Sequence, residues 1–271
     1  MAITTMDGLI AAMQPFGEDV LKAAFTGEAA GQYHSGFYLS GRPGAAAAPS
    51  SGINGASLTS YAGQIPIPAA VAGKNIHLAR LEFSQAGGIG AITIMDRLWH
   101  NSGIAVATTT AQAISMSALP ARDNNGATLG AGIMAAIEVS TATTNVSPIT
   151  NTTISYTNEA GVSGRTGTMA SFPATAQPGT FVPFSLQAGD LGIRSIQSVT
   201  LGTSYGGGTI HLVLYREMAS LGAPIANVTA SAGPIELGLP RIYDNSVLFC
   251  IFSLISVTAG ITNAQLTFAQ G

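Results

Sequence analysis

The chain has 271 residues, of which only 8% are charged, and its formal net charge is −3. A typical soluble domain carries roughly 25% charged residues, so this chain has few charges to keep its surface apart from other proteins, and we expect other subunits to cover much of it. Its ten Lys and Arg residues are scattered, which argues against the basic cluster that direct nucleic-acid binding requires.

The single cysteine, the apolar run near the C-terminus and the first ten residues indicate where the protein is made. Cys250 excludes an intrachain disulfide and a cysteine-based metal cluster, and we expect a buried, inert thiol because it lies in the apolar run of residues 247–257. That run is shorter than the ~20 residues of a membrane-spanning helix, and residues 1–10 lack the basic stretch and apolar core of an ordinary secretory signal. We therefore expect synthesis in a cytoplasm, with no membrane partner.

Residues 1–75 differ from the rest and are predicted to form an extended, partly helical N-terminal arm. Asp7 can cap a short helix that runs to residue 13, and residues 18–25 predict a second short helix with apolar side chains on one side. Residues 27–63 mix glycine, alanine and proline with isolated aromatic residues. Such a segment has no core of its own, so it is either disordered or packed across another surface, and the aromatic residues favour packing.

We expect the arm to lock assembly by folding onto a partner surface, because only extensive apolar contact offsets the entropy lost on ordering a segment of this length. The rest of the chain is then expected to fold by itself when residues 1–63 are deleted. The predicted contact residues of the arm are Val20, Leu21, Phe25, Tyr33, Phe37 and Tyr38.

Residues 76–271 are predicted to form a mainly β body, an antiparallel β-sandwich or jelly roll, because short alternating segments are separated by turn-rich gaps. Glycines at positions 87, 88 and 90 predict a hairpin between the first two strands. Residues 111–119 have a helical alternative, and a boundary near residues 145–150 would divide the body in two. The predicted strands are residues 76–84, 91–99, 104–109, 132–140, 152–158, 180–186, 194–201, 209–216, 246–257 and 264–269.

Few residues suggest chemistry, and we assign no catalytic, cofactor-binding or metal-binding residues. Asp96 and His100 are four apart and would share one face of a strand, where a carboxylate can orient an imidazole for base catalysis. The same residues also fit a partly exposed strand end, and we favour this interpretation over catalysis. Residues 123–126, Asp-Asn-Asn-Gly, suit a turn better than a calcium site, because the remainder of an EF-hand loop is missing.

Residues 152–168 predict a strand, a glycine turn and a second strand. Together, the Ala/Gly-rich arm and the low-charge β body rich in Thr, Ser, Ala and Gly resemble virion proteins of tailed bacteriophages, especially head decoration or minor capsid proteins. The resemblance implies a structural protein of the virion that is not an enzyme, has a β-sandwich or jelly-roll body and is commonly a trimer. Its partners would be further copies of itself and the major capsid protein or other virion proteins, after synthesis in the host cytoplasm.

Two other functions compete with this expectation. A receptor- or glycan-binding β module of a phage fibre or adhesin would show exposed aromatic residues clustered at one loop end. A hydrolase on a β scaffold would need a polar cleft with perturbed carboxylates or His100. We expect assembly rather than catalysis, because the sequence carries a charge deficit and no catalytic motif.

Overall fold

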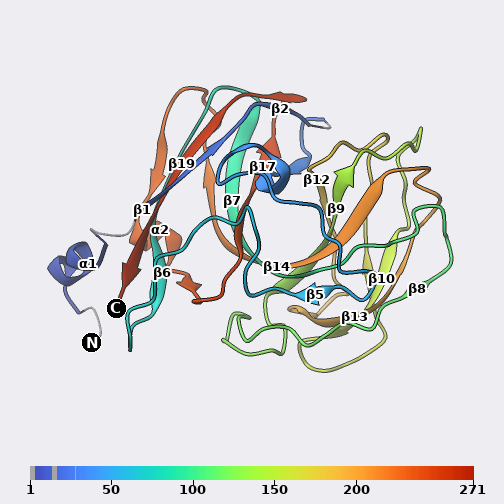
Figure 1. Ribbon diagram of the computed structural model, residues 1–271, viewed down its shortest axis with the longest axis horizontal. Coiled ribbons are helices and arrows are strands. Elements are labelled where there is room, and N and C mark those ends of the chain that lie inside the picture. The colour runs from blue at the N-terminus through green and yellow to red at the C-terminus, as the bar shows by residue number, and fades with distance from the viewer. Residues whose placement is uncertain (1–3, 14–16, 28) are drawn as a thin grey trace.

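Six strands of the chain close into an antiparallel barrel. The computed structural model describes residues 4–13, 17–27 and 29–271, and strands predominate in it (Figure 1). Around the barrel the order is β14-β9-β12-β3-β17-β7, and β7 pairs back with β14. These strands are β3 (Tyr33–Ser35), β7 (Ile89–His100), β9 (Ile133–Thr141), β12 (Thr180–Pro183), β14 (Thr209–Gly222) and β17 (Leu248–Leu254), and β5 (Ala56–Ser57) adds to β7 outside the ring.

The mainly β, antiparallel prediction is confirmed, whereas the layout differs from a two-sheet sandwich or jelly roll. The difference comes from the length of β14, which has 14 residues. Its residues 209–216 pair with β9 and its residues 213–222 pair with β7. One long strand with a different neighbour on each edge thus completes the ring, and a closed ring leaves no free strand edge.

An open sheet packs on each side of the barrel, as Figure 1 shows with β1, β6 and β19 on one side and β10 and β13 on the other. One sheet has the order β15-β6-β19-β1-β4, with β16 also paired to β6, and the other has the order β11-β10-β13-β8. The first contains β1 (Gly17–Lys22), β4 (Gly41–Arg42), β6 (Ile76–Gln85), β15 (Ala230–Ala232), β16 (Arg241–Ile242) and β19 (Thr262–Gln270). The second contains β8 (Gln112–Ala113), β10 (Thr153–Asn158), β11 (Arg165–Thr168) and β13 (Ile193–Thr200).

The remaining elements are short and lie outside these sheets. β2 (Phe25–Thr26) pairs with β18 (Thr258–Ala259) in a two-stranded sheet. Helix α1 (Met6–Met13) confirms the predicted helix, but Asp7 lies within its first turn rather than capping it. The Thr5 hydroxyl accepts a hydrogen bond from the Gly8 N–H at 3.1 Å. Helix α2 (Pro234–Leu237) and the 3-10 turn η1 (Gly36–Tyr38) complete the fold.

Strand alternation gives the barrel wall two apolar faces. Along β17, Phe249 and Ile251 belong to the core inside the barrel, while Cys250 and Phe252 belong to the core between the barrel and the six-stranded sheet. A third core lies between the barrel and the four-stranded sheet. Both faces of β17 are thus covered within the chain, and Cys250 is buried as expected.

The structure corrects the prediction of a separate arm. Residues 18–25 do not form a helix: β1 pairs with β19 and β4, and its buried residues Val20 and Lys22 alternate with exposed ones as in a strand. β3 lies between β12 and β17 and completes the barrel. Residues 43–75 are largely irregular apart from β5, and they cross the body of the same chain, where Leu58 donates to the carbonyl oxygen of Leu98 and Ile65 to that of Leu248. A β body without residues 1–63 would lack one barrel strand and an edge of the six-stranded sheet.

Other predictions are also settled by the strand pairing. The hairpin predicted for residues 76–99 is wrong, because β6 pairs with β19 in the outer sheet while β7 lies in the barrel. Residues 104–109 form no strand, and residues 111–119 contain the short β8 rather than a helix. The hairpin predicted within residues 152–168 is confirmed as β10 and β11. Barrel strands lie on both sides of residues 145–150, so no division of the barrel falls there.

Candidate functional site

Asp96 and His100 do not form a catalytic dyad. The Asp96 carboxylate is buried and accepts two hydrogen bonds from Arg122, at 3.0 Å from Nε and 3.1 Å from Nη2. It also accepts from the Ser246 hydroxyl and from the Val247 N–H, both at 2.9 Å. His100 instead accepts a hydrogen bond at Nδ1 from Arg97 Nε, at 3.1 Å. The two side chains therefore serve different polar networks.

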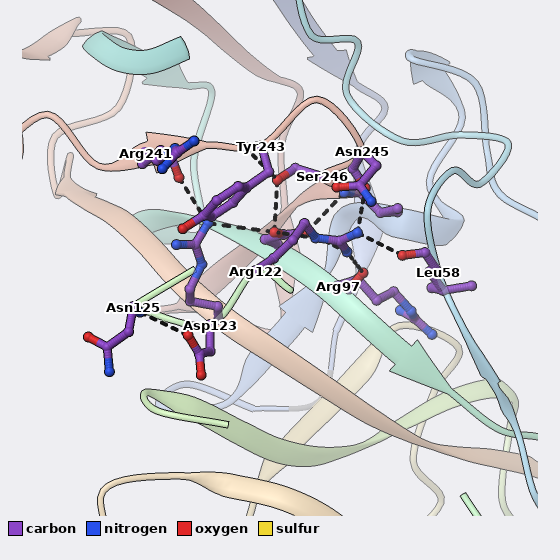
Figure 2. A network of polar contacts seen from close by, with 12 residues as sticks. Leu58, Arg97, Arg122, Asp123, Asn125, Arg241, Tyr243, Asn245 and Ser246 are labelled. Carbon is purple, nitrogen blue, oxygen red and sulfur yellow. Dashed lines mark hydrogen bonds and ion pairs between the residues drawn. The ribbon is translucent and has the colours of Figure 1, made fainter. Parts of the chain in front are cut away.

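Arg122 connects distant segments rather than binding a ligand (Figure 2). Besides Asp96, its guanidinium donates to the carbonyl oxygens of Leu58, Arg97 and Asn245. These five hydrogen bonds match the five N–H donors of an arginine, so none remains for a substrate. This network joins the loop that contains Leu58, the barrel strand β7 and the turn before β17, and its role is structural.

A second polar network lies inside the barrel. Arg97 and Glu138 form an ion pair at 2.7 Å with both side chains fully buried, and the Tyr38 hydroxyl donates to Glu138 at 2.8 Å. The Phe37 ring covers Arg97, with 4.4 Å between the guanidinium carbon and the ring centroid. Burial, helped by the positive charge of Arg97, lowers the pKa of His100 to about 2. His100 can accept the hydrogen bond from Arg97 only as a neutral imidazole. The network as a whole fills one end of the barrel.

Residues 123–126 form the predicted turn. The Asp123 carboxylate accepts hydrogen bonds from the backbone N–H groups of Asn125, Ala127, Gly130 and Ala131, at 2.8 to 3.3 Å. Four donors aimed at one carboxylate occupy the oxygen atoms that a calcium ion would need. Among the described residues no group of three or more His, Cys, Asp or Glu side chains is placed to hold a metal ion.

The six predicted contact residues of the arm do not form one surface. Val20 and Phe37 are each 1% exposed and belong to the cores of this chain. Phe25 and Tyr38 are half-buried. Leu21 and Tyr33 are exposed, but Leu21 lies on the six-stranded sheet and Tyr33 on the barrel strand β3. Most of the predicted apolar contact is thus made within the chain.

A different surface is the better candidate for contact with a partner. Three loops, residues 86–88, 223–229 and 255–261, gather around the turn between β6 and β7, and we call them the apolar loop end. Backbone hydrogen bonds join Ala86 to Ile261, Gly87 to Gly260 and Gly88 to Ile255, and others join Ala223 to Gly90 and Asn227 to Gln85. The loops expose five aliphatic side chains, each 48 to 65% accessible: Ile225, Val228, Ile255, Val257 and Ile261.

The apolar loop end carries no charged residue in any of its three loops. A hollow of about 120 Å³ lies on it, lined by residues 222–225 and 228–230. The sequence indicates this surface by its lack of charge, which our sequence analysis did not use. Residues 218–235 and 245–271 contain no Asp, Glu, Lys or Arg. Six exposed aliphatic side chains lie in those stretches. Five of them lie in the three loops, and the sixth, Ile235, lies on helix α2.

The surface is poorer in charge than the composition suggests. Its accessible area is 10870 Å². The chain has 23 charged residues, ten basic and 13 acidic, and seven of these 23 are buried. At most 16 charged residues therefore lie on that surface. The buried ones are Lys22, Asp96, Arg97, Arg122, Asp123, Glu138 and Arg216.

Comparisons with known proteins do not identify the chain. No protein-family model matches it, and no curated protein is similar to it. The structure of the Gt strain of infectious bursal disease virus shares 13% identity, with 94% of this chain and 65% of that chain covered, at a TM-score of 0.17. T=1 particles derived from the same virus share 11% identity, with 96% of this chain and 78% of that chain covered, at a TM-score of 0.18. At such scores neither likeness carries an argument.

No helix among the described residues is both long and apolar enough to span a membrane.

Proposed function

We propose that the chain is a structural subunit of a virion, a decoration or cement protein that assembles as a homo-oligomer on a phage head. Its proposed partners are copies of itself, in a trimer as the resemblance suggests, and the major capsid protein, and it has no catalytic role. The observation that carries the proposal is the apolar loop end, an uncharged surface with five exposed aliphatic side chains.

Burial of this surface against a second copy is favourable. Fully burying a valine or isoleucine side chain contributes about 1.5–3 kcal/mol, and these five are about half exposed, so together they can contribute roughly 5 kcal/mol. Because the loops hold no charge, a partner with the same surface meets no like-charge repulsion there. Homo-oligomers mostly have closed rotational symmetry, and in a trimer three copies of one surface can meet around the threefold axis.

The receptor- or glycan-binding alternative has less support. Such a module would expose several aromatic rings at one place. Among the described residues, Tyr33 is the one exposed aromatic side chain, and the others are buried or half-buried. The two functions differ in what the free surface contacts.

The mass of the particle in solution tests the proposal. We expect an oligomer for the unmodified protein by analytical ultracentrifugation, and co-sedimentation with capsids that lack it. Ile225→Asp and Val257→Asp place a charge on the apolar loop end and should shift the mass toward the monomer. Val146→Asp is the matched control, because Val146 is 91% exposed and lies outside the three loops. A monomer at every concentration that also fails to bind capsids would refute the proposed function.

A further inference from the structure

The two ends of the barrel differ. The Arg97–Glu138 ion pair and the rings of Phe37 and Tyr61, stacked with 5.5 Å between centroids, fill one end. At the other end, where β7 begins and β17 stops, the barrel opens into a cavity of about 200 Å³. We call this cavity the barrel mouth, and it is lined by Tyr33, Thr93, Met95, Phe181, Pro183, Tyr215, Glu217, Ser220, Ile251 and Ser253.

Aromatic rings and one carboxylate come together at the barrel mouth. Phe181 and Tyr215 meet edge to face, with 5.2 Å between their centroids, and Tyr33 stands opposite on β3 with part of its ring accessible. Glu217 follows Tyr215 on the same face of β14 and is exposed. Met95 and Ile251 give the cavity an apolar floor.

The Glu217 carboxylate lacks a positive partner. No ion pair or hydrogen bond to its side chain is found among the described residues. Arg97, which also lies on barrel strand β7, is paired with Glu138. Glu217 and Tyr215 line the same cavity, and burial, together with the negative charge of Glu217, raises the pKa of Tyr215. The barrel mouth therefore combines negative charge with the faces and edges of aromatic rings.

We propose that the barrel mouth binds a small organic ammonium ion, with Glu217 balancing its charge and Tyr33, Phe181 and Tyr215 surrounding its alkyl groups. Aromatic rings attract a cation through their quadrupole, and quaternary ammonium groups are recognised by rings arranged around them. Pockets for drug-sized ligands span about 300–1,000 Å³, so this smaller cavity suits a ligand with few heavy atoms. The site is independent of the proposed role in assembly.

Choline and its neutral isostere 3,3-dimethylbutan-1-ol provide a direct test, because they share a shape and differ in charge. The Met95 methyl group on the cavity floor reports binding through its NMR chemical shift, assigned with Met95→Leu. We expect choline to shift this signal saturably and to bind about tenfold more tightly than the isostere, which corresponds to ~1.4 kcal/mol. n-Butylammonium, which mimics a lysine side chain, tests whether a primary ammonium group is also accepted.

Two variants identify the residues responsible. Glu217→Gln should weaken choline binding about tenfold and leave the isostere unaffected, and Tyr33→Leu should weaken choline binding while the protein stays folded, because Tyr33 is 42% exposed. Asp19→Asn, an exposed carboxylate on the outer sheet, is the control and should bind as the unmodified protein does. No shift with either cation, equal affinity for choline and the isostere, or equal loss in the control would each overturn the proposal. Oligomer mass is measured separately, so its outcome does not decide this one.

Discussion

Acid should destabilise the fold through buried histidines, and His34 is the clearest case. His34 is 1% exposed on β3, its ring stacks on Phe25 with 4.0 Å between centroids, and neither ring nitrogen has a hydrogen-bond partner in the described structure. Burial lowers its pKa from 6.5 to about 3. The unfolded chain therefore takes up a proton below about pH 6.5 that the folded chain does not take up until about pH 3, and stability falls as the pH drops between these values.

The size of this effect follows from linkage. Between pH 6.5 and pH 5, one such histidine costs about 1.5 kcal/mol of unfolding free energy. His100, with its pKa lowered to about 2, should cost a similar amount, so the two together should cost about 3 kcal/mol. Burial also lowers the pKa of His211, which acts in the same direction. Against a typical stability of 5–15 kcal/mol, a loss of this size is easily measured.

Urea unfolding at pH 8, pH 6.5 and pH 5 measures the loss, followed by circular dichroism. His34→Leu removes one titrating group, so the decrease between pH 6.5 and pH 5 should shrink by about 1.5 kcal/mol. A packing change from the substitution affects both pH values alike and cancels in that difference. Equal stability of the unmodified protein at pH 6.5 and pH 5, or an unaltered decrease in His34→Leu, would refute the reasoning.

Three further predictions concern the interior. Arg122→Met removes the partner of a buried carboxylate and should cost about 3–5 kcal/mol in urea unfolding; a loss below 1 kcal/mol would show that Asp96 is satisfied without it. Cys250 is 1% exposed and burial raises the pKa of its thiol to about 11, so iodoacetamide should label it only after unfolding, and rapid labelling of the native protein would contradict its burial. Deletion of residues 1–63 removes β1 to β5 and should leave an insoluble or unfolded chain, whereas a soluble β-rich product would support the expectation that the rest of the chain folds by itself.

The sequence predicted strands well and their partners poorly. Alternation along β6, β9 and β13 is a local property, so these strands were found within a few residues of their ends. Pairing is not local: β6 meets β19 and β7 meets β14 and β17. The apolar residues on both faces of residues 91–99 were the available clue that this segment lies in an inner layer, but a glycine-rich turn favoured a hairpin.

Buried charged residues lie at two places where the sequence prediction was wrong. A helix was predicted for residues 18–25 because their apolar side chains would share one helical side. In β1 the buried residues are Val20 and Lys22, and the Lys22 amino group donates to the carbonyl oxygens of Leu39 and Pro43. Asp96 and His100 read as an exposed strand end because their partners Arg122 and Arg97 could not be assigned to them from sequence spacing. A charged residue inside a strand pattern is ambiguous until its counter-ion is located, and the counter-ion of Asp96 lies 26 residues away.

The pairing of β1 with β19 sets the order in which this chain can complete its fold. Residue 22 pairs with residue 262, and a ribosome working at roughly 5–20 residues per second needs about 12–48 s to make the chain between them. During that interval one edge of β1 is unpaired, and β3 waits for β12 and then for β17. The growing chain thus exposes apolar strands before their neighbours exist, a condition that favours aggregation at high expression. A chaperone that shields the early strands should therefore raise the yield of native protein.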